Sequence, residues 1–301
     1  MHLCNIVSSS RLYQFIALYY SIEQNIKHFE VYVLCMDDDT SRILGAIGFG
    51  HMHLIPLSRL EDDVLLNAKS SRTISEYCWT LKPAFILHIL KQYAFINRLT
   101  YLDADMFLYN DPSYVFEKEK SASVLLSRHN FSKELMYMEK DAGIFNSGFI
   151  SFKNSREGIG CLTWWKERCI DWCYDTTVTG QFGDQKYLEL MYESFKGISI
   201  IEDPGINVAP WNEAKRKFTR SRGKLYIDDS PLILYHYCGF RICSKSSCIF
   251  MFGNTYKPLI HNPYMQAVKK AILQVQGIDS CFDGCFSEKS TIEKFNRYSI
   301  V

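Results

Sequence analysis

Residues 99–112 have the sequence LTYLDADMFLYNDP, in which a short apolar run ends at two aspartates, Asp103 and Asp105. Tyr101 and Leu102 suit a buried strand, and ligands of an open parallel sheet gather just beyond the carboxyl ends of its strands. Mg2+ and Mn2+ prefer hard oxygen ligands such as carboxylates, and they complete their coordination shell with water and phosphate oxygens. The stretch therefore predicts a metal site that faces a phosphate-bearing ligand at the end of a strand.

A second Asp-x-Asp pair, Asp37 and Asp39, follows the apolar run VYVLCM. The residues after it, TSRILG, are typical of a helix, so a solvated turn or a helix cap explains this pair. Ordinary aspartate usage gives on the order of one Asp-x-Asp by chance in a chain of this length. The interpretation of Asp103 and Asp105 therefore depends on the rest of the chain.

Composition limits the classes of function. The chain has 301 residues, of which 47% are hydrophobic and 15% aromatic, so it can bury a large core as one large domain or two. Its formal net charge of +1 gives neither the basic surface expected for nucleic-acid binding nor strong attraction to a membrane. We therefore expect no nucleic-acid partner, and local side chains must neutralise any charge on a substrate.

The eleven cysteines do not predict a disulfide framework. Their number is odd, the chain is long, and no charged-then-apolar signal segment precedes the first strand. The spacings within 238–248 and 281–285 lack the paired C-x2-C pattern of zinc modules. We expect free, packed thiols in a cytoplasmic protein. No apolar run reaches the length of a membrane span, so association with the inner face of a membrane would be peripheral at most.

Strands alternate with helices in the first hundred residues. HLCNIVSSS (residues 2–10) predicts a short strand that ends in a serine-rich turn, and apolar residues then recur at helical spacing from Leu12 to Ile26. EVYVLCM (30–36) and HLIPL (53–57) predict two further strands. This order predicts a doubly wound sheet.

The segment TLKPAFILHILKQY, residues 80–93, predicts a strong helix that leads directly into the Asp103 stretch. We expect Lys82 to open this helix. Pro83 would then lie in the first turn, where the missing amide hydrogen costs little.

The second half predicts a mixed α/β arrangement that continues without a linker to about residue 245, followed by a terminal helix and a polar tail (279–301) that packs on the surface or is partly mobile. The expected strands are 121–127, 198–202 and 231–238, and the expected helices are 161–173, 184–195 and 263–276. The segment GIFNSGFISFKN (143–154) lies between the first of these strands and the first helix.

Six motifs occur in a fixed order: TLKP, YLDADMFLYNDP, NSGFISFKN, FGDQKYL, DPGINVAPWN and LYHYCGF. Taken together they make the chain, from about residue 3 to 245, resemble the GT-A glycosyltransferases, most closely the bacterial enzymes related to glycosyltransferase family 8 that build surface polysaccharides and lipopolysaccharide. The resemblance implies an α/β fold of the GT-A type, with a Rossmann-like, mostly parallel sheet flanked by helices. It also implies a catalytic domain (1–245), divided into a nucleotide-binding half (1–110) and a donor-sugar and acceptor half (111–245), and a small C-terminal helical extension (246–301).

The resemblance further assigns roles to individual residues. It implies that Asp103, Asp105 and His236 hold a Mn2+ or Mg2+ ion, since a neutral imidazole beside two carboxylates suits such an ion. The residues implied to contact the nucleotide are Val7, Ser8, Ser9, Asp103, Ala104, Gly239 and Arg241. The residues implied to surround the donor sugar or to act in catalysis are Lys82, Asn146, Asp184 and Gln185.

Two positions depart from the pattern of the family. Relatives often continue after the histidine with a glycine and a lysine that grips the diphosphate, whereas here Gly239 is followed by Phe240 and Arg241. We expect the guanidinium of Arg241 to bind phosphate in place of that lysine. Lys186 stands where many relatives carry an aspartate, which leaves the sugar preference open. Trp211 suits either stacking on an acceptor sugar or packing.

The resulting hypothesis is a metal-dependent transferase. It would move a hexose from a nucleotide sugar, most simply a UDP-hexose, to a glycan or lipid-linked glycan acceptor with retention of configuration, in surface polysaccharide or lipopolysaccharide biosynthesis. Two alternatives stay open. One is a haloacid dehalogenase-type phosphatase with Asp103 as nucleophile, although position 107 is Phe where that class has Thr. The other is a catalytically silent glycan-binding protein on the same fold.

Overall fold

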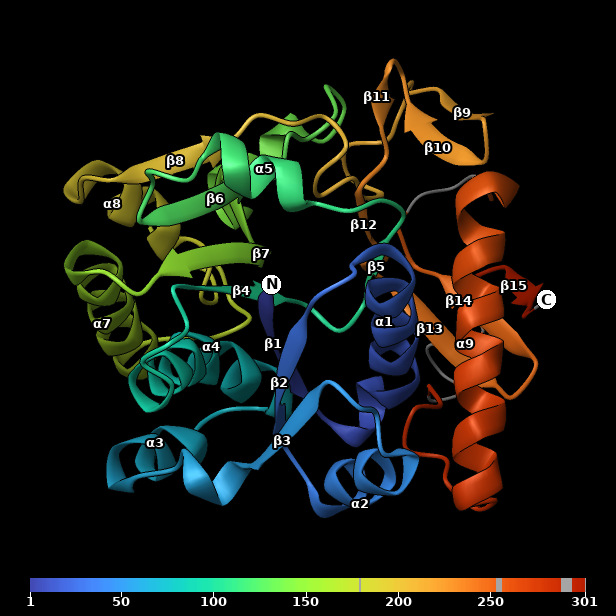
Figure 1. The fold of residues 1–301 in the computed structure, drawn as a ribbon, viewed down its shortest axis with the longest axis horizontal. Helices are drawn as coiled ribbons and strands as arrows, with labels where there is room; N and C mark the ends of the chain where they lie inside the picture. The colour runs from blue at the N-terminus through green and yellow to red at the C-terminus, as the bar shows by residue number, and fades with distance from the viewer. Residues whose placement is uncertain (179, 253–255, 288–293, 301) are drawn as a thin grey trace.

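A seven-stranded sheet with the order β3-β2-β1-β4-β7-β6-β8 forms the centre of the protein (Figure 1). The structure is a computed structural model that describes residues 1–178, 180–252, 256–287 and 294–300. The sheet strands are β1 (His2–Val7), β2 (Glu30–Cys35), β3 (Met52–Pro56), β4 (Arg98–Leu102), β6 (Val124–Arg128), β7 (Phe145–Lys153) and β8 (Ile198–Ile201).

The first four strands are parallel, and helices connect them, as the alternation in the sequence predicts. Helices α1, α2 and α9 cover one face of the sheet, and α3, α4, α7 and α8 cover the other, which gives two buried apolar clusters (Figure 1). The helix bounds are α1 (Leu12–Asn25), α2 (Asp38–Ile47), α3 (Asp63–Lys69), α4 (Ile74–Gln92), α5 (Ser113–Lys118), α6 (Glu139–Ala142), α7 (Arg156–Asp171), α8 (Tyr187–Ser194) and α9 (Pro258–Ile278).

The parallel order ends at β4, which pairs antiparallel with β7. This neighbour matters because β7 carries the NSG motif and β4 ends at the Asp103 loop. The amide of Asp103 donates a hydrogen bond to the carbonyl of Gly148 over 2.9 Å. The sheet is therefore parallel from β3 to β4 and mixed from β4 to β8.

The start of α4 differs from the prediction. The helix begins at Ile74, six residues before the expected start, because Thr73 and Glu76 form a capping box: the Thr73 hydroxyl accepts from the Glu76 amide, and the Glu76 carboxylate accepts from the Thr73 amide. Lys82 and Pro83 therefore lie in the interior of the helix. The prediction was wrong because it overlooked the Thr-x-x-Glu signal at 73–76.

Three small sheets surround the central one. Strands β5 (Met106–Leu108) and β12 (Leu234–His236) pair antiparallel, as do β9 (Phe218–Ser221), β10 (Lys224–Ile227) and β11 (Ser230–Pro231). Strands β13 (Phe240–Ser244), β14 (Ser247–Phe250) and β15 (Arg297–Ser299) form the third. This last sheet crosses residue 245, and the boundary predicted there stays a prediction.

The terminal helix is confirmed as α9, which starts five residues before the expected position and packs along α1. Parts of the tail are more deeply packed than the sequence indicates, because Phe282 and Cys285 are buried and the Phe282 ring meets Tyr13 edge-on with centroids 5.7 Å apart. The remaining tail residues 288–293 and 301 lie outside the described residues.

The cysteines are free thiols, and seven of the eleven are buried in the packed layers. Across the described ranges, no helix combines the length and apolarity required to cross a membrane.

The capping box of α4 generates a test of stability. Replacing Thr73 with Ala removes the hydroxyl that accepts from the Glu76 amide, so we expect the free energy of unfolding to fall by about 1 kcal/mol. Thr73→Ser keeps the hydroxyl and should stay close to the unmodified protein. Urea denaturation measures both changes, and equal midpoints for the two variants would contradict the role of the cap.

Candidate functional site

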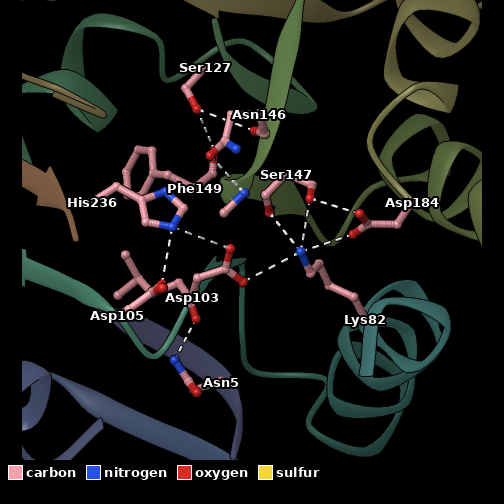
Figure 2. A network of polar contacts seen from close by, with 12 residues as sticks. Asn5, Lys82, Asp103, Asp105, Ser127, Asn146, Ser147, Phe149, Asp184 and His236 are labelled. Atoms are coloured by element: carbon pink, nitrogen blue, oxygen red, sulfur yellow. Dashed lines mark hydrogen bonds and ion pairs between the residues drawn. The ribbon is translucent and has the colours of Figure 1, made fainter. Parts of the chain in front are cut away.

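Three side chains from two distant segments of the sequence meet beyond the end of β4. Asp103 and Asp105 lie on the loop after β4, and β5 follows this loop directly. Because β5 pairs with β12 in a register that places His236 opposite Met106, the imidazole reaches the loop. His236 Nε2 lies 3.1 Å from Asp105 Oδ1 and 3.9 Å from Asp103 Oδ2 (Figure 2).

The chemistry of this donor set fits a small divalent cation. One ligand atom from each of the three residues lies within 4.8 Å of the other two. An octahedral ion with bonds of about 2.1 Å separates adjacent ligands by about 3 Å, which is the spacing of His236 and Asp105. The structure thus places the predicted ligands together, and the binding of a metal ion by them stays a prediction.

The electrostatics of the site favour the ionised form of the Asp105 carboxylate. Burial alone would raise the pKa of Asp105, but His236, Arg11 and Arg241 lower it below its usual range. Burial also opposes a charge on His236, yet Asp105 and Asp103 raise its pKa. The imidazole and the carboxylate therefore each favour the charged form of the other.

Lys82 forms a second cluster beside the first (Figure 2). Its side chain is 2% exposed, and Nζ lies 2.9 Å from Asp184 Oδ2 and 3.5 Å from Asp103 Oδ1. Nζ also donates to Ser147 Oγ over 2.9 Å, and that hydroxyl donates to Asp184 Oδ1 over 3.0 Å. Burial would lower the pKa of Lys82, but the two carboxylates more than offset this and raise it. Lys82 is therefore a buried, protonated ammonium group.

A bulge in β7 brings the NSG motif into the site. Leu126 of β6 pairs with Ile150, but the next residue, Ser127, pairs with Asn146, so residues 147–149 have no partner in this ladder. Such bulges redirect side chains near active sites. A Cβ atom on Gly148 would stand 2.7 Å from Asp103 Oδ2 and 2.8 Å from Asn146 Oδ1. Position 148 therefore needs glycine, because β7 closely approaches Asp103 on the loop after β4.

The residues predicted to contact the nucleotide lie at or after the ends of three strands, β1, β4 and β12. Val7 ends β1 and is buried, Ser8 Oγ lies 2.8 Å from Ser10 Oγ, and the Ser9 amide donates to Asp37 Oδ2 over 2.8 Å. Asp37 also accepts from the Thr40 amide as the N-cap of α2, so the cap interpretation of this Asp-x-Asp pair is confirmed.

Gly239 and Arg241 follow β12 in the sequence. Gly239 has φ of +79°, a conformation that favours glycine, and Ala104, on the loop after β4, is buried. Burial and the neighbouring Arg11 lower the pKa of Arg241, whereas Asp105 raises it. The charges of Arg11 and Arg241 therefore act both on each other and on the Asp105 carboxylate, and an anionic ligand would offset the repulsion between the two guanidinium groups.

Gln185 and Trp211 have partners of their own. The Gln185 amide donates to the carbonyl of Ala142 over 2.8 Å, so it takes no part in the Lys82 cluster. The Trp211 indole donates to the carbonyl of His129 over 2.9 Å, and its ring meets the His236 ring edge-on at 5.1 Å. This arrangement supports packing beside a predicted metal ligand as the role of Trp211.

Asp184 does not cap α8. The helix begins at Tyr187 and has no side-chain cap, whereas Asp184 is buried against Lys82. Sequence reasoning missed two other members of the site, Ser147 and His129. Ser147 could have been found inside the NSG motif, but the position of His129 after β6 gave no signal.

Comparison with known proteins gives the family. A family model described as nucleotide-diphospho-sugar transferase matches residues 27–200. The chain belongs to the nucleotide-diphospho-sugar transferase family. It is accordingly a glycosyltransferase.

Two relatives from Bacillus subtilis (strain 168) span nearly the whole chain. The uncharacterized protein YfnF is 40% identical over 294 residues, which are 95% of this chain and 97% of the relative. The uncharacterized protein YfnD is 32% identical over 298 residues, 97% of this chain and 96% of the relative. These sequences extend the family across the C-terminal part of the chain.

Solved structures agree on the fold. The galactosyltransferase LgtC, in complex with donor and acceptor sugar analogues, aligns with 98% of this chain and 100% of its own at a TM-score of 0.54 and 13% identity. The glycosyltransferase GlyE of Streptococcus pneumoniae TIGR4 aligns with 96% of this chain and 65% of its own at a TM-score of 0.55 and 13% identity. The nucleotide-diphospho-sugar transferase described here therefore has the predicted GT-A fold.

The bulge at Gly148 generates a test of activity. Gly148→Ala would push a methyl group against Asp103 and Asn146, so we expect turnover of a nucleotide sugar to fall by at least about tenfold. Gly160→Ala is the matched control, because a Cβ at position 160 of α7 meets nothing within 4 Å. Donor hydrolysis and thermal melting measure both variants. Full activity of Gly148→Ala would show that the close approach is not needed.

The Lys82 cluster generates a test of stability. Lys82→Met leaves Asp184 buried without its cation, and we expect a loss of about 3–5 kcal/mol in the free energy of unfolding. In the double variant Lys82→Met with Asp184→Asn, no uncompensated charge remains at this pair, so part of the loss should be recovered. Chemical denaturation at pH 7 compares the two, and a double variant less stable than Lys82→Met would contradict the ion-pair account.

Proposed function

We propose that this protein transfers a hexose from a UDP-sugar to a hydroxyl group of a glycan or lipid-linked glycan, with Mn2+ or Mg2+ and with retention of configuration. One observation carries the proposal: the convergence of Asp103, Asp105 and His236 at the end of β4, directly beside the buried Lys82 and Asp184. Carboxylates, an imidazole and flanking arginines at one strand end suit a diphosphate with its cation.

Asp103, Asp105 and His236 would hold the cation. A bound Mg2+ or Mn2+ ion supplies Lewis-acid stabilisation of the leaving diphosphate. Arg241, with Arg11 beside it, would contact the phosphates, in the role that a lysine fills in many relatives. The turn at Ser8 and Ser9, together with the backbone around Val7, Ala104 and Gly239, would face the nucleoside.

Asn146, Asp184 and Gln185 would line the donor sugar. The Asp184 carboxylate would stabilise positive charge that develops at the anomeric carbon. Lys82 holds Asp184 and Asp103 in fixed positions through its ammonium group. Because Lys82 is protonated, we assign it a positioning and electrostatic role and not that of a general base.

The two alternatives have less support. The chain belongs to a sugar-transferase family whose model includes Asp103 and Asp105, and this disfavours a phosphatase of the haloacid dehalogenase type. A silent glycan-binding protein would have no need for the ion-pair cluster around Asp184, and it predicts binding of glycan without metal. Polysaccharide or lipopolysaccharide biosynthesis, at the cytoplasmic side of a membrane, is the setting that we propose.

The proposed metal site is tested by calorimetric titration with UDP. We expect UDP to bind at least about tenfold more tightly with Mn2+ than after EDTA treatment, because oxygens of the diphosphate would be ligands of the ion. Asp105→Ala should remove this dependence. Asp39→Ala is the matched control, since Asp39 belongs to the other Asp-x-Asp pair and its exposed carboxylate pairs with the exposed Arg42. Equal UDP affinity with and without metal would refute the site.

Transfer itself needs a separate measurement. A panel of UDP-hexoses with Mn2+ should yield released UDP for at least one donor, and Asp105→Ala should abolish the release at a temperature where thermal melting shows that the variant is still folded. Metal-independent glycan binding with no UDP release from any nucleotide sugar would favour the silent protein.

A further inference from the structure

His129, just after β6, is fixed on every side although no role is assigned to it. It is 4% exposed, its ring stacks on Phe131 with centroids 4.6 Å apart, and its amide donates to the carbonyl of Ile144 over 2.8 Å. Its own carbonyl accepts from the Trp211 indole over 2.9 Å and from the Asn212 amide over 2.8 Å. The backbone is therefore anchored independently of the imidazole.

The imidazole has one consistent tautomer. Nδ1 lies 2.9 Å from the carbonyl of Gly143, which can only accept, so Nδ1 carries the proton. Burial lowers the pKa of His129 to about 3, so the ring is neutral at pH 7 and Nε2 has a free lone pair. The atom 3.3 Å from Nε2 is Asn146 Nδ2, which must be the donor.

The same logic fixes the amide of Asn146 from its other end. Asn146 Oδ1 accepts from the Gly148 amide over 3.1 Å. Turning the amide over would place Oδ1 against the Nε2 lone pair and Nδ2 against the Gly148 N–H, which exchanges two attractions for two repulsions. The carbonyl oxygen of Asn146 thus lies on the side of Asp103, since both oxygens are within 2.8 Å of the point where a Cβ on Gly148 would stand.

We propose that His129 is a positioning residue that makes Asn146 present a hydrogen-bond acceptor, beside the Asp103 carboxylate, to a hydroxyl group of the donor sugar. This inference rests on the proposed function, because it gives Asn146 its place at the sugar. Two adjacent acceptors select a hydroxyl donor and disfavour a sugar that carries an acceptor at that position. His129 touches no reacting atom and acts through Asn146.

Two isosteric variants separate the two hydrogen bonds of the ring. In His129→Gln the side-chain oxygen can take the place of Nε2 and accept from Asn146, but the donor to Gly143 is lost. In His129→Asn the amide nitrogen can take the place of Nδ1 and donate to Gly143, but the acceptor for Asn146 is lost. Each variant keeps one bond of the two, so a purely structural role predicts similar losses for both.

We expect the variants to differ in turnover. With Mn2+ and the UDP-hexose that the unmodified protein hydrolyses fastest, His129→Asn should lower kcat about tenfold or more, and His129→Gln should stay within about threefold. Calorimetric affinity for UDP should stay within about twofold in both, because the diphosphate binds elsewhere. In an Asn146→Ala background, His129→Asn should cause no further loss, since the group that it positions is gone.

A spectroscopic measurement tests the hydrogen bond without a substrate. The 15N resonances of labelled histidine, with His129 identified by its absence in His129→Asn, should show a protonated Nδ1 and an unprotonated Nε2 at pH 7. Asn146→Ala should shift the Nε2 resonance. A protonated Nε2, or equal kcat for the Gln and Asn variants, would overturn the inference. If the unmodified protein releases UDP from no nucleotide sugar, the proposed function fails, and the Nε2 resonance still decides whether His129 orients Asn146.

Discussion

The site depends on the ion pairs that the buried ammonium group of Lys82 makes with Asp103 and Asp184. This group joins the interior of α4, the loop after β4, the bulge of β7 and the turn before α8 at one point, through Asp103, Ser147 and Asp184. Two carboxylates in a low-dielectric interior would repel each other without this cation. Its presence allows one carboxylate to lie on the loop after β4 and the other just before α8, with an oxygen of each within 3.5 Å of Lys82 Nζ.

Much of the fold could be predicted from the sequence because its signals are local. The strands before Asp103 are continuous apolar runs between helical patterns, and the order of short motifs pointed to a sugar transferase. The prediction failed at the start of α4. Pro83 suggested a first turn near residue 80, but the capping pair Thr73 and Glu76 starts the helix at Ile74. Local patterns identify elements well, but competing local signals decide where an element begins.

The site could be predicted only where its residues stand in recognisable motifs. Asp103, Asp105 and His236 belong to such motifs, and the pairing of β5 with β12 brings them together. Ser147 lies inside the NSG motif and could have been found there, whereas His129 could not, because its contact with Asn146 depends on a register shift between β6 and β7 that spacing does not reveal. Contacts made across a bulge depend on three-dimensional register, and a single sequence contains no direct record of it.

The Asp-x-Asp pair without a metal role still affects the site. Asp37 accepts hydrogen bonds from the Ser9 amide and from the first turn of α2, so the turn after β1 is tied to its neighbour before any ligand arrives. A loop that is already ordered loses little conformational entropy on association. Under the proposed function, preorganisation of this kind would let contacts of a nucleoside with the turn add to affinity without an entropic cost of ordering the chain.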